Sequence, residues 1–295
     1  MKIVIISISD TYESLVPVLE EAGHTIKLLT DKTTPVYIDE NTSFTQNYIQ
    51  NIIDEFEPDL VVNGMPTLTL PDSTDYTYFA NTEESANLEI NKWNARIKAG
   101  ELGWLLPPVI EECKYNEVTT KNKTTFVKPK NAWQRSFKIL RDENPLETSY
   151  FRRQDDCYVE QQIEYEVAGI CHFTISNGEY KIWKVSGSNT TGEQKRLKGN
   201  VDWRLKCEEV PLTELQKHEF TRLCRKWLDY AVTLGGTYHG ELMGGITAYN
   251  RGIYWFEQNS RLSTFGRYTG TADAWIKSLT ETPRHAINAT WEFFR

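Results

Sequence analysis

The stretch GIYWFEQNSRLSTFG, residues 252–266, carries three chemically active side chains at alternate positions after an apolar run. Glu257, Asn259 and Arg261 are two residues apart, and such side chains project from one face of a β-strand. A carboxylate and a carboxamide offer hard oxygen ligands for Mg²⁺ or Mn²⁺, and an arginine beside them suits a phosphate or an oxyanion. The alternative is an ordinary strand that runs out into solvent. The pattern therefore indicates either a metal site or a strand end.

The composition is that of a folded protein, and it argues against a general nucleic-acid-binding protein. The 295 residues suffice for a sizeable core with two or three sub-domains, and the formal net charge of −8 lacks the cationic excess that phosphate contacts need. No apolar run is long enough to span a bilayer, and the first residues do not resemble a signal peptide. Five cysteines without a CxxC pair indicate reduced thiols and argue against a zinc site. We therefore expect a cytoplasmic protein, either a monomer or a dimer.

The first 64 residues alternate between β-branched runs and helical patterns. KIVIISIS, TIKLLT and PDLVVNG read as strands, and amphipathic segments separate them. This order predicts a small parallel α/β domain, with ligands at the carboxyl ends of its strands, near 7–11 and 63–66. Asp10 and Gly64 are therefore candidate substrate-binding residues.

The remainder reads as a helix followed by many short strands. A helix is expected over 82–100, with Thr82 as its N-cap and acidic residues in its first turn. After Pro107-Pro108 the pattern changes to short strands. A second long helix is expected over 212–234, and then a hairpin that turns at 250–252.

Four stretches, in this order, resemble the ATP-grasp superfamily, and within it phosphoribosylamine–glycine ligase. SANLEINKWNARIKAGELGWLLPP resembles that family's "LE-x-S-K" segment, FVKPK its "VVK" strand, and YVEQQIEYEVA its hinge "EE-F-L-x-G-x-E". HGELMGGITAYNRGIYWFEQNSR is similar to "GVLYAGLM…GPKVLEFN-x-R". The resemblance covers roughly residues 1–270, and the combination is more specific than any single motif. It implies a mixed α/β and α+β architecture, an ATP-grasp fold behind a small parallel α/β domain.

The resemblance also implies roles for particular residues. The catalytic pair would be Lys128 and Arg261, with Arg261 facing an acyl phosphate. Metal ligands would be Glu257 and Asn259, and Glu241 would either add a ligand or face solvent. The residues that would contact ATP are Lys92, Lys128, Glu160, Gln161, Ile163 and Glu166.

Some of these assignments leave alternatives open. Tyr165 stands where the family has glycine, so the carboxylate that holds the ribose is either Glu166 or Glu164. Lys92, taken alone, also fits a solvated helix surface. Lys128 follows the apolar pair Phe126-Val127, and this alternation turns it inward or toward a cleft.

The sequence also departs from the family. The glycine-rich turn of the family is Ser7-Ile8-Ser9-Asp10-Thr11 here, and without glycines the backbone cannot approach a phosphate as closely. Glu193-Gln194-Lys195-Arg196 resembles the family's "DHKR" loop, which makes Lys195 and Arg196 candidate substrate-binding residues. The chain ends without the further lobe of that family. We expect the catalytic residues to be kept and substrate recognition to differ.

The expected activity is ATP-dependent carboxylate–amine ligation. Joining a carboxylate to an amine in water requires activation of the carboxylate, which ATP achieves as an acyl phosphate. Partners would be a small carboxylate, such as glycine or another amino acid, and an amine. Two alternatives stay open: an ATP-binding regulatory protein without ligation, and an ATP-grasp kinase.

The expected segments follow the motifs. They are a parallel α/β domain at 1–80, a helical linker with the first ATP-grasp segment at 81–115, a flap sub-domain with the hinge at 116–185, and a C-terminal sub-domain with the metal site at 186–295.

Overall fold

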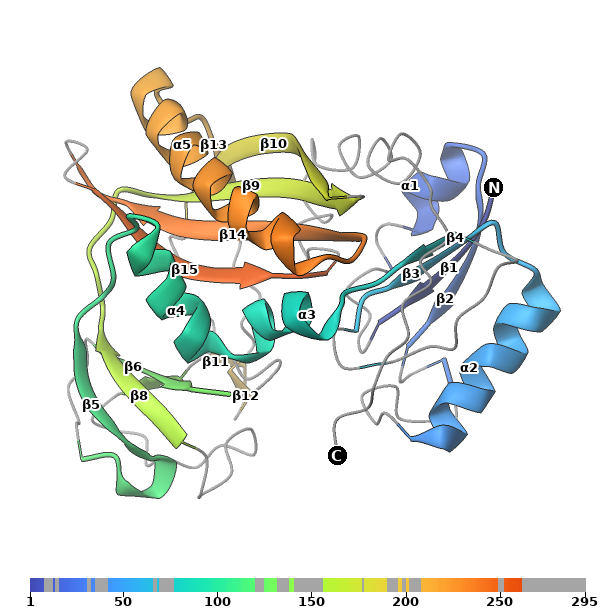
Figure 1. Ribbon diagram of the computed structural model, residues 1–295, viewed down its shortest axis with the longest axis horizontal. Helices are drawn as coiled ribbons and strands as arrows, with labels where there is room; N and C mark the ends of the chain where they lie inside the picture. Colours follow the sequence, from blue (N-terminus) through green and yellow to red (C-terminus); the bar gives the residue numbers. More distant parts are fainter. Residues whose placement is uncertain are drawn as a thin grey trace.

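The described part of the computed structural model has three larger β-sheets arranged around a pair of short helices, and a small two-stranded sheet besides (Figure 1). The described residues are 1–7, 13, 16–30, 33–34, 42–65, 68, 77–119, 125–131, 138–140, 156–176, 178–189, 196–197, 200–201, 208–248 and 252–261.

The N-terminal sheet is parallel, as expected, and has the strand order β2-β1-β3-β4. A hydrophobic cluster covers each of its faces. The β-branched residues of β1 are therefore fully buried, as is usual in a parallel sheet. The sequence pattern missed β4, a short strand just before the helix pair. The elements are β1 (Lys2–Ile6), α1 (Val16–Glu21), β2 (Thr25–Leu29), α2 (Ser43–Phe56), β3 (Leu60–Asn63) and β4 (Thr77–Phe79).

The second sheet is antiparallel, with the order β5-β8-β6-β7. Along β6, Thr125, Val127 and Pro129 are buried in one direction, so Phe126 and Lys128 project in the other. The alternation expected for Lys128 is therefore confirmed. The strands are β5 (Val109–Lys114), β6 (Thr125–Pro129), β7 (Lys138–Leu140) and β8 (Asp156–Gln161), with the 3₁₀ turn η2 (Tyr115–Glu117) after β5.

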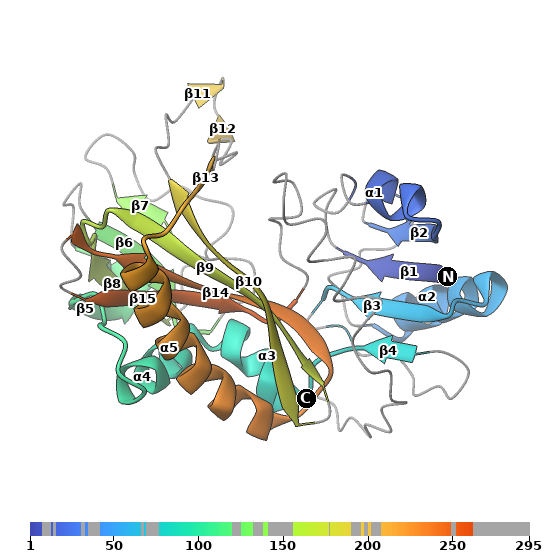
Figure 2. The same cartoon turned by 90° about the horizontal axis from the view of Figure 1, so that it is seen from above.

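The third sheet is also antiparallel and has the order β13-β10-β9-β14-β15. Its strand β9 pairs with β10 on one side and with β14 on the other, a grouping that crosses the expected segment boundary at residue 185. In the view from above, α5 crosses these strands (Figure 2). The elements are β9 (Val167–Ser176), β10 (Glu179–Asn189), β13 (Glu208–Val210), α5 (Glu214–Ala231), η3 (Val232–Leu234), β14 (Tyr238–Ile246) and β15 (Ile253–Asn259). Between β10 and β13, β11 (Arg196–Leu197) and β12 (Asn200–Val201) pair with each other as a separate two-stranded sheet.

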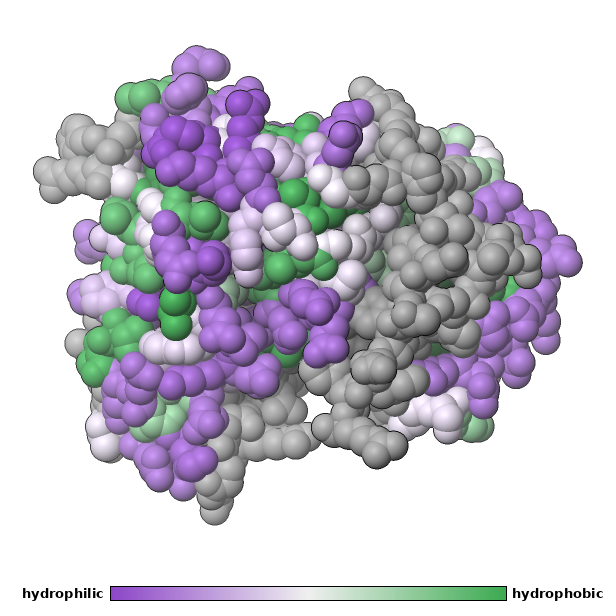
Figure 3. Space-filling model, viewed as in Figure 1, coloured by the Kyte–Doolittle hydropathy of each residue, from purple (hydrophilic) through white to green (hydrophobic). Residues whose placement is uncertain are grey.

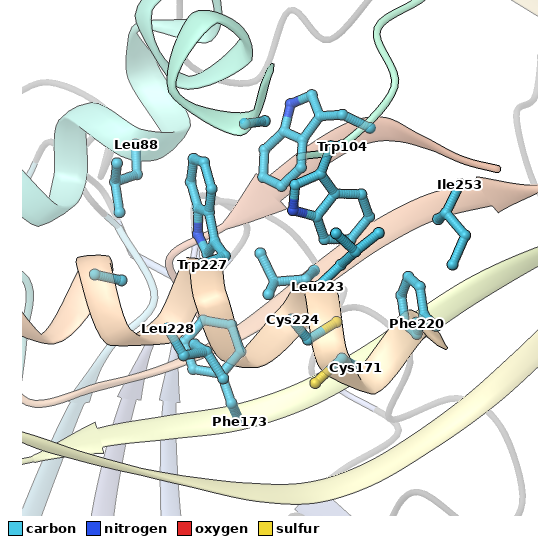
Figure 4. Packing of buried hydrophobic residues seen from close by; sticks show 14 of the residues in the cluster. Leu88, Trp104, Cys171, Phe173, Phe220, Leu223, Cys224, Trp227, Leu228 and Ile253 are labelled. Carbon is cyan, nitrogen blue, oxygen red and sulfur yellow. The ribbon is translucent and has the colours of Figure 1, made fainter. Parts of the chain in front are cut away.

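The main hydrophobic core lies between α5 and the third sheet (Figure 4). Trp227 of α5 is fully buried, and its ring centroid lies 4.3 Å from that of Trp255 on β15. Phe220 packs over β9 at Gly169, where an added Cβ would lie 2.9 Å from the phenyl ring. Glycine therefore permits a close contact between helix and sheet, and β15 rests on a rigid support.

One expected helix is in fact two: α3 (Glu83–Ile90) and α4 (Lys92–Glu101). The single helix expected over 82–100 was wrong because Asn91 interrupts it with a ψ of 78°. The Asn91 side chain accepts a hydrogen bond from the backbone N–H of Asn94, which makes it the N-cap of α4. The expected N-cap at Thr82 is confirmed, in a capping box with Ser85.

The helix pair connects the three sheets. Before α3, Ala80 forms a bridge with Thr237, and the side-chain amide of Asn81 donates to the carbonyl oxygen of Ser260 at 2.5 Å. At the start of α4, the backbone N–H of Trp93 donates to the carbonyl oxygen of Lys130 at 3.3 Å. The helices therefore hold the ends of β6 and β15 in fixed relation.

The visible surface over α2 and α5 is mainly hydrophilic (Figure 3). Among the described residues, no helix is long and apolar enough to cross a membrane.

Replacing Thr82 with alanine should destabilise the protein more than the matched change Thr213→Ala. Both threonines cap a helix through a capping box, and each loss costs about 1 kcal/mol. Thr82 also donates to the carbonyl oxygen of Leu234 at 2.7 Å, a bond worth roughly another 1 kcal/mol. Urea unfolding measures both free energies. Equal losses would show that the bond to Leu234 adds nothing.

Candidate functional site

A cleft lies where the helix pair, the second sheet and β15 meet. The space between its walls is about 290 Å³ when the open solvent at its mouth is included. The described residues that line it are Leu88, Glu89, Lys92, Ala95, Lys128, Tyr158, Trp255, Phe256, Glu257 and Gln258. Three expected site residues, Lys92, Lys128 and Glu257, are therefore brought together from sequence positions far apart.

Lys128 reaches the cleft from β6 and pairs with Glu160 on the neighbouring strand β8. Their charged groups are in direct contact, and the side chain of Glu160 is only 5% exposed. Burial alone would lower the pKa of Lys128, but Glu160, Tyr158 and Glu257 together more than offset it, so that pKa is raised. Lys128 is therefore a firmly protonated lysine at the cleft wall.

Lys92 is the first residue of α4 and lies in a different electrostatic environment. Its ammonium donates to the backbone carbonyl of Glu89 at 3.3 Å. Burial lowers the pKa of Lys92, and the carboxylates of Glu257 and Glu89 offset this only in part. The two lysines therefore differ. The charged form of Lys128 is stabilised, whereas the nearby carboxylates balance the positive charge of Lys92 only in part.

The end of β15 carries a chain of hydrogen bonds. The amide nitrogen of Asn259 donates to Glu241 Oε1 at 2.6 Å, and Arg261 Nη2 donates to Asn259 Oδ1 at 3.2 Å. Glu241 and Asn259 are opposite one another on β14 and β15. Glu241 is 2% exposed, so the alternative that it faces solvent is wrong. The reading of Glu257, Asn259 and Arg261 as an ordinary strand end in solvent fails for Asn259, which is also buried.

Glu89 of α3 fixes the residues that follow this strand. Its Oε2 accepts from the backbone N–H of Ser260 at 2.8 Å, and its Oε1 accepts from Arg261 Nε at 2.8 Å. Glu89 is 2% exposed, and its charge is balanced by the arginine. The sequence analysis missed Glu89. Its position three residues before Lys92 is a weak signal that these two side chains share a site.

The oxygen atoms near the end of β15 suit a metal ion that is also bound by the phosphates of a ligand. In the described part of the chain, no group of three or more His, Cys, Asp or Glu residues is arranged to bind a metal ion. The oxygen donors available are those of Glu241, Glu257 and Asn259. Mg²⁺ is usually bound by one or two carboxylates together with substrate phosphates, so these residues fit a phosphate-bound Mg²⁺ rather than an all-protein cage.

The hinge residues expected to contact ATP do not line this cleft in the described structure, apart from Glu160, which joins it through Lys128. Gln161 ends β8 and is exposed, and Ile163 lies in the connection between the two antiparallel sheets. Glu164 is also exposed. Glu166 accepts a hydrogen bond from Gln216 of α5 at 3.3 Å. The roles of these residues stay predictions.

The expected substrate-binding residues lie elsewhere or cannot be described. The backbone N–H of Gly64, after β3, donates to the carbonyl oxygen of Ile6 at 2.9 Å, at the carboxyl end of the N-terminal sheet. Asp10 and Lys195 fall outside the described residues, and so does the side chain of Arg196, whose backbone lies in β11.

Several solved structures resemble the fold of this chain over most of its length. A carboxyaminoimidazole ribonucleotide synthase from Aspergillus clavatus, complexed with ATP, matches with a TM-score of 0.61 and 12% identity, over 97% of this chain and 78% of that one. An L-amino acid ligase from Bacillus licheniformis matches with a TM-score of 0.58 and 14% identity, over 90% and 68%. A biotin carboxylase from Campylobacter jejuni, in a complex with ATP, matches with a TM-score of 0.56 and 13% identity, over 93% and 67%.

No family model matches the sequence, and no curated protein is significantly similar to it. At such low identities the structural likeness establishes the fold and nothing finer. The likeness to phosphoribosylamine–glycine ligase in particular is not supported by these comparisons. The chain therefore has an ATP-grasp fold behind a small N-terminal parallel α/β domain.

Replacing the two lysines with methionine should change stability in opposite directions. Lys128→Met removes the close cation of the buried Glu160 and should lower the unfolding free energy. Lys92→Met removes an incompletely compensated cation and should leave the nucleotide-free protein equally stable or more stable. Urea unfolding at neutral pH measures both. A large loss in Lys92→Met would contradict this account of the cleft.

The wild-type protein should gain stability as the pH rises through the lowered pKa of Lys92 toward its ordinary value of 10.5. Over that range the unfolded chain binds more protons than the folded one, so the free energy of unfolding increases with pH. The control is Lys92→Met, in which this component of the pH profile should be missing. Superimposable profiles would show that the Lys92 pKa is not lowered.

Proposed function

We propose that this protein is an ATP-dependent ligase that activates a carboxylate as an acyl phosphate and transfers it to an amine. The observation that carries the proposal is the meeting of Lys92, Lys128 and Glu257 in one cleft. Phosphoryl transfer requires positive charge and positioning around the phosphates, which two lysines from facing walls supply. Two of the structurally similar proteins, an L-amino acid ligase and a synthase complexed with ATP, support the same reaction class.

Each described residue has a distinct task in this proposal. Lys92 and Lys128 hold phosphate oxygens; the backbone carbonyl of Glu89 positions the first ammonium and the carboxylate of Glu160 the second. Glu257, Asn259 and Glu241 would hold Mg²⁺ or Mn²⁺, which when bound neutralises phosphate charge. Arg261 is oriented by Glu89 and Asn259, so that its guanidinium has a fixed position beside these ligands. There it stabilises the negative charge that develops on the reacting acyl group.

The proposed substrates are a small carboxylate, such as glycine or another amino acid, and an amine. The sequence resemblance to phosphoribosylamine–glycine ligase suggests these classes. The lost glycine turn at 7–11 is a reason to expect an amine other than phosphoribosylamine. The cationic loop at Lys195-Arg196 favours an anionic partner.

The deciding experiment is a screen of carboxylates and amines for ADP release. A ligase should release ADP and phosphate only when the right carboxylate and amine are both present, and mass spectrometry should show the amide. A kinase would release ADP without an amine. ATP binding with no ADP from any mixture would instead favour a regulatory protein. Absence of ATP binding at millimolar concentration with Mg²⁺ would contradict all of these functions.

Glu257→Gln and Asn259→Ala should each lower turnover by about a hundredfold or more, because fewer hard ligands weaken the hold on the metal. Raised Mg²⁺ or Mn²⁺ should recover part of the loss. Steady-state kinetics at several metal concentrations measures the effect, and cooperative urea unfolding of each variant serves as the control for an intact fold. Turnover close to that of the wild type in both variants would remove these residues from the metal site.

A further inference from the structure

Two cations approach one buried carboxylate, that of Glu160. Oε1 is in contact with the ammonium of Lys128, whereas Oε2 lies 3.8 Å from Nε of Arg96 on α4. The second distance is too long for a hydrogen bond. Glu160 is 3% exposed and Arg96 9%, so water cannot replace either partner. Glu160 thus has one close cation and a second one just out of range.

Arg96 is held in place by other contacts. One of its terminal nitrogens donates to the carbonyl oxygen of Pro107, and its guanidinium carbon lies 5.7 Å from the ring centroid of Trp93 and 6.0 Å from that of Tyr158. Its Nε is buried and has no hydrogen-bond acceptor in the described part of the chain. A buried N–H without an acceptor is unfavourable, and a small shift would bring Nε to Glu160.

The proposed function requires Lys128 to turn its charge to a phosphate, and the inference rests on that function. When Lys128 does so, Glu160 loses its close partner, and a buried carboxylate without a partner is strongly destabilising. Arg96 lies four residues after Lys92, on the same face of α4, and therefore on the cleft side of the helix.

We propose that Arg96 is a positioning residue that takes over the Glu160 carboxylate when Lys128 engages the nucleotide. The exchange keeps Glu160 paired in both states. It converts Lys128 from one half of an ion pair into a cation available to a phosphate. Arg96 itself does not touch the nucleotide.

A double-mutant cycle on ATP affinity tests the exchange. Calorimetry with ATP and Mg²⁺ compares wild type, Arg96→Gln, Glu160→Gln and the double variant. With Glu160 present, Arg96→Gln should weaken ATP binding about tenfold or more, because releasing Lys128 then leaves a bare carboxylate. In the Glu160→Gln background, where that carboxylate is replaced by a neutral amide, the same change at Arg96 should alter the affinity less than about twofold.

Two further variants separate this role from packing. Arg96→Lys keeps a cation near Glu160, so it should retain most of the ATP affinity. It loses only the forked guanidinium that reaches Pro107. Arg222→Gln removes an exposed arginine paired with Glu219 on α5 and should leave the affinity unchanged. Urea unfolding of each variant establishes that the fold is intact.

The outcomes are distinguishable. An equal loss of affinity on Arg96→Gln in both backgrounds, or an Arg96→Lys variant as weak as Arg96→Gln, would overturn the exchange and leave the proposed function standing. No ATP binding by the wild type would overturn the proposed function and the exchange together.

Discussion

Charge balance in a confined space is the constraint on which this structure depends. Lysines and arginines can be withdrawn from water only where carboxylates compensate them, since an unpaired buried charge is costly. The cleft meets this condition pair by pair, Lys128 with Glu160 and Arg261 with Glu89. Lys92 is the exception, since the nearby carboxylates compensate it only in part. In the proposed function, a polyanionic ligand would complete the balance.

The fold brings these pairs together because three sheets meet at one helix pair. β6 and β8 supply Lys128 and Glu160, β15 supplies Glu257 and Asn259, and the helices contribute the residues between them. The break at Asn91 matters here, because it makes Lys92 the start of a new helix while Glu89 stays on the preceding one. One continuous helix would direct these side chains differently.

Sequence reasoning succeeded where the periodicity of a single strand determines the side-chain direction. Alternation placed Lys128 on the cleft face. It does not account for Glu257, because residues 255–258 all line the cleft and the pairing of β14 with β15 shifts register there. It failed where a role arises only from contacts between elements. Nothing local marks Glu89 as the acceptor for Ser260, or Arg96 as the neighbour of Glu160. The expected helix over 82–100 was wrong for a related reason. An asparagine side chain can form hydrogen bonds to nearby backbone groups, and this favours a helix cap over a helix interior.

The central claim is that the cleft binds a nucleotide through its phosphates. The most direct test is calorimetric titration of the wild-type protein, with Mg²⁺ present, by ATP, ADP and adenosine in turn. The account predicts that affinity falls at each step as phosphates are removed, and that the ATP affinity weakens with added salt. Equal affinities for ATP and adenosine, or no binding of any of the three, would contradict it.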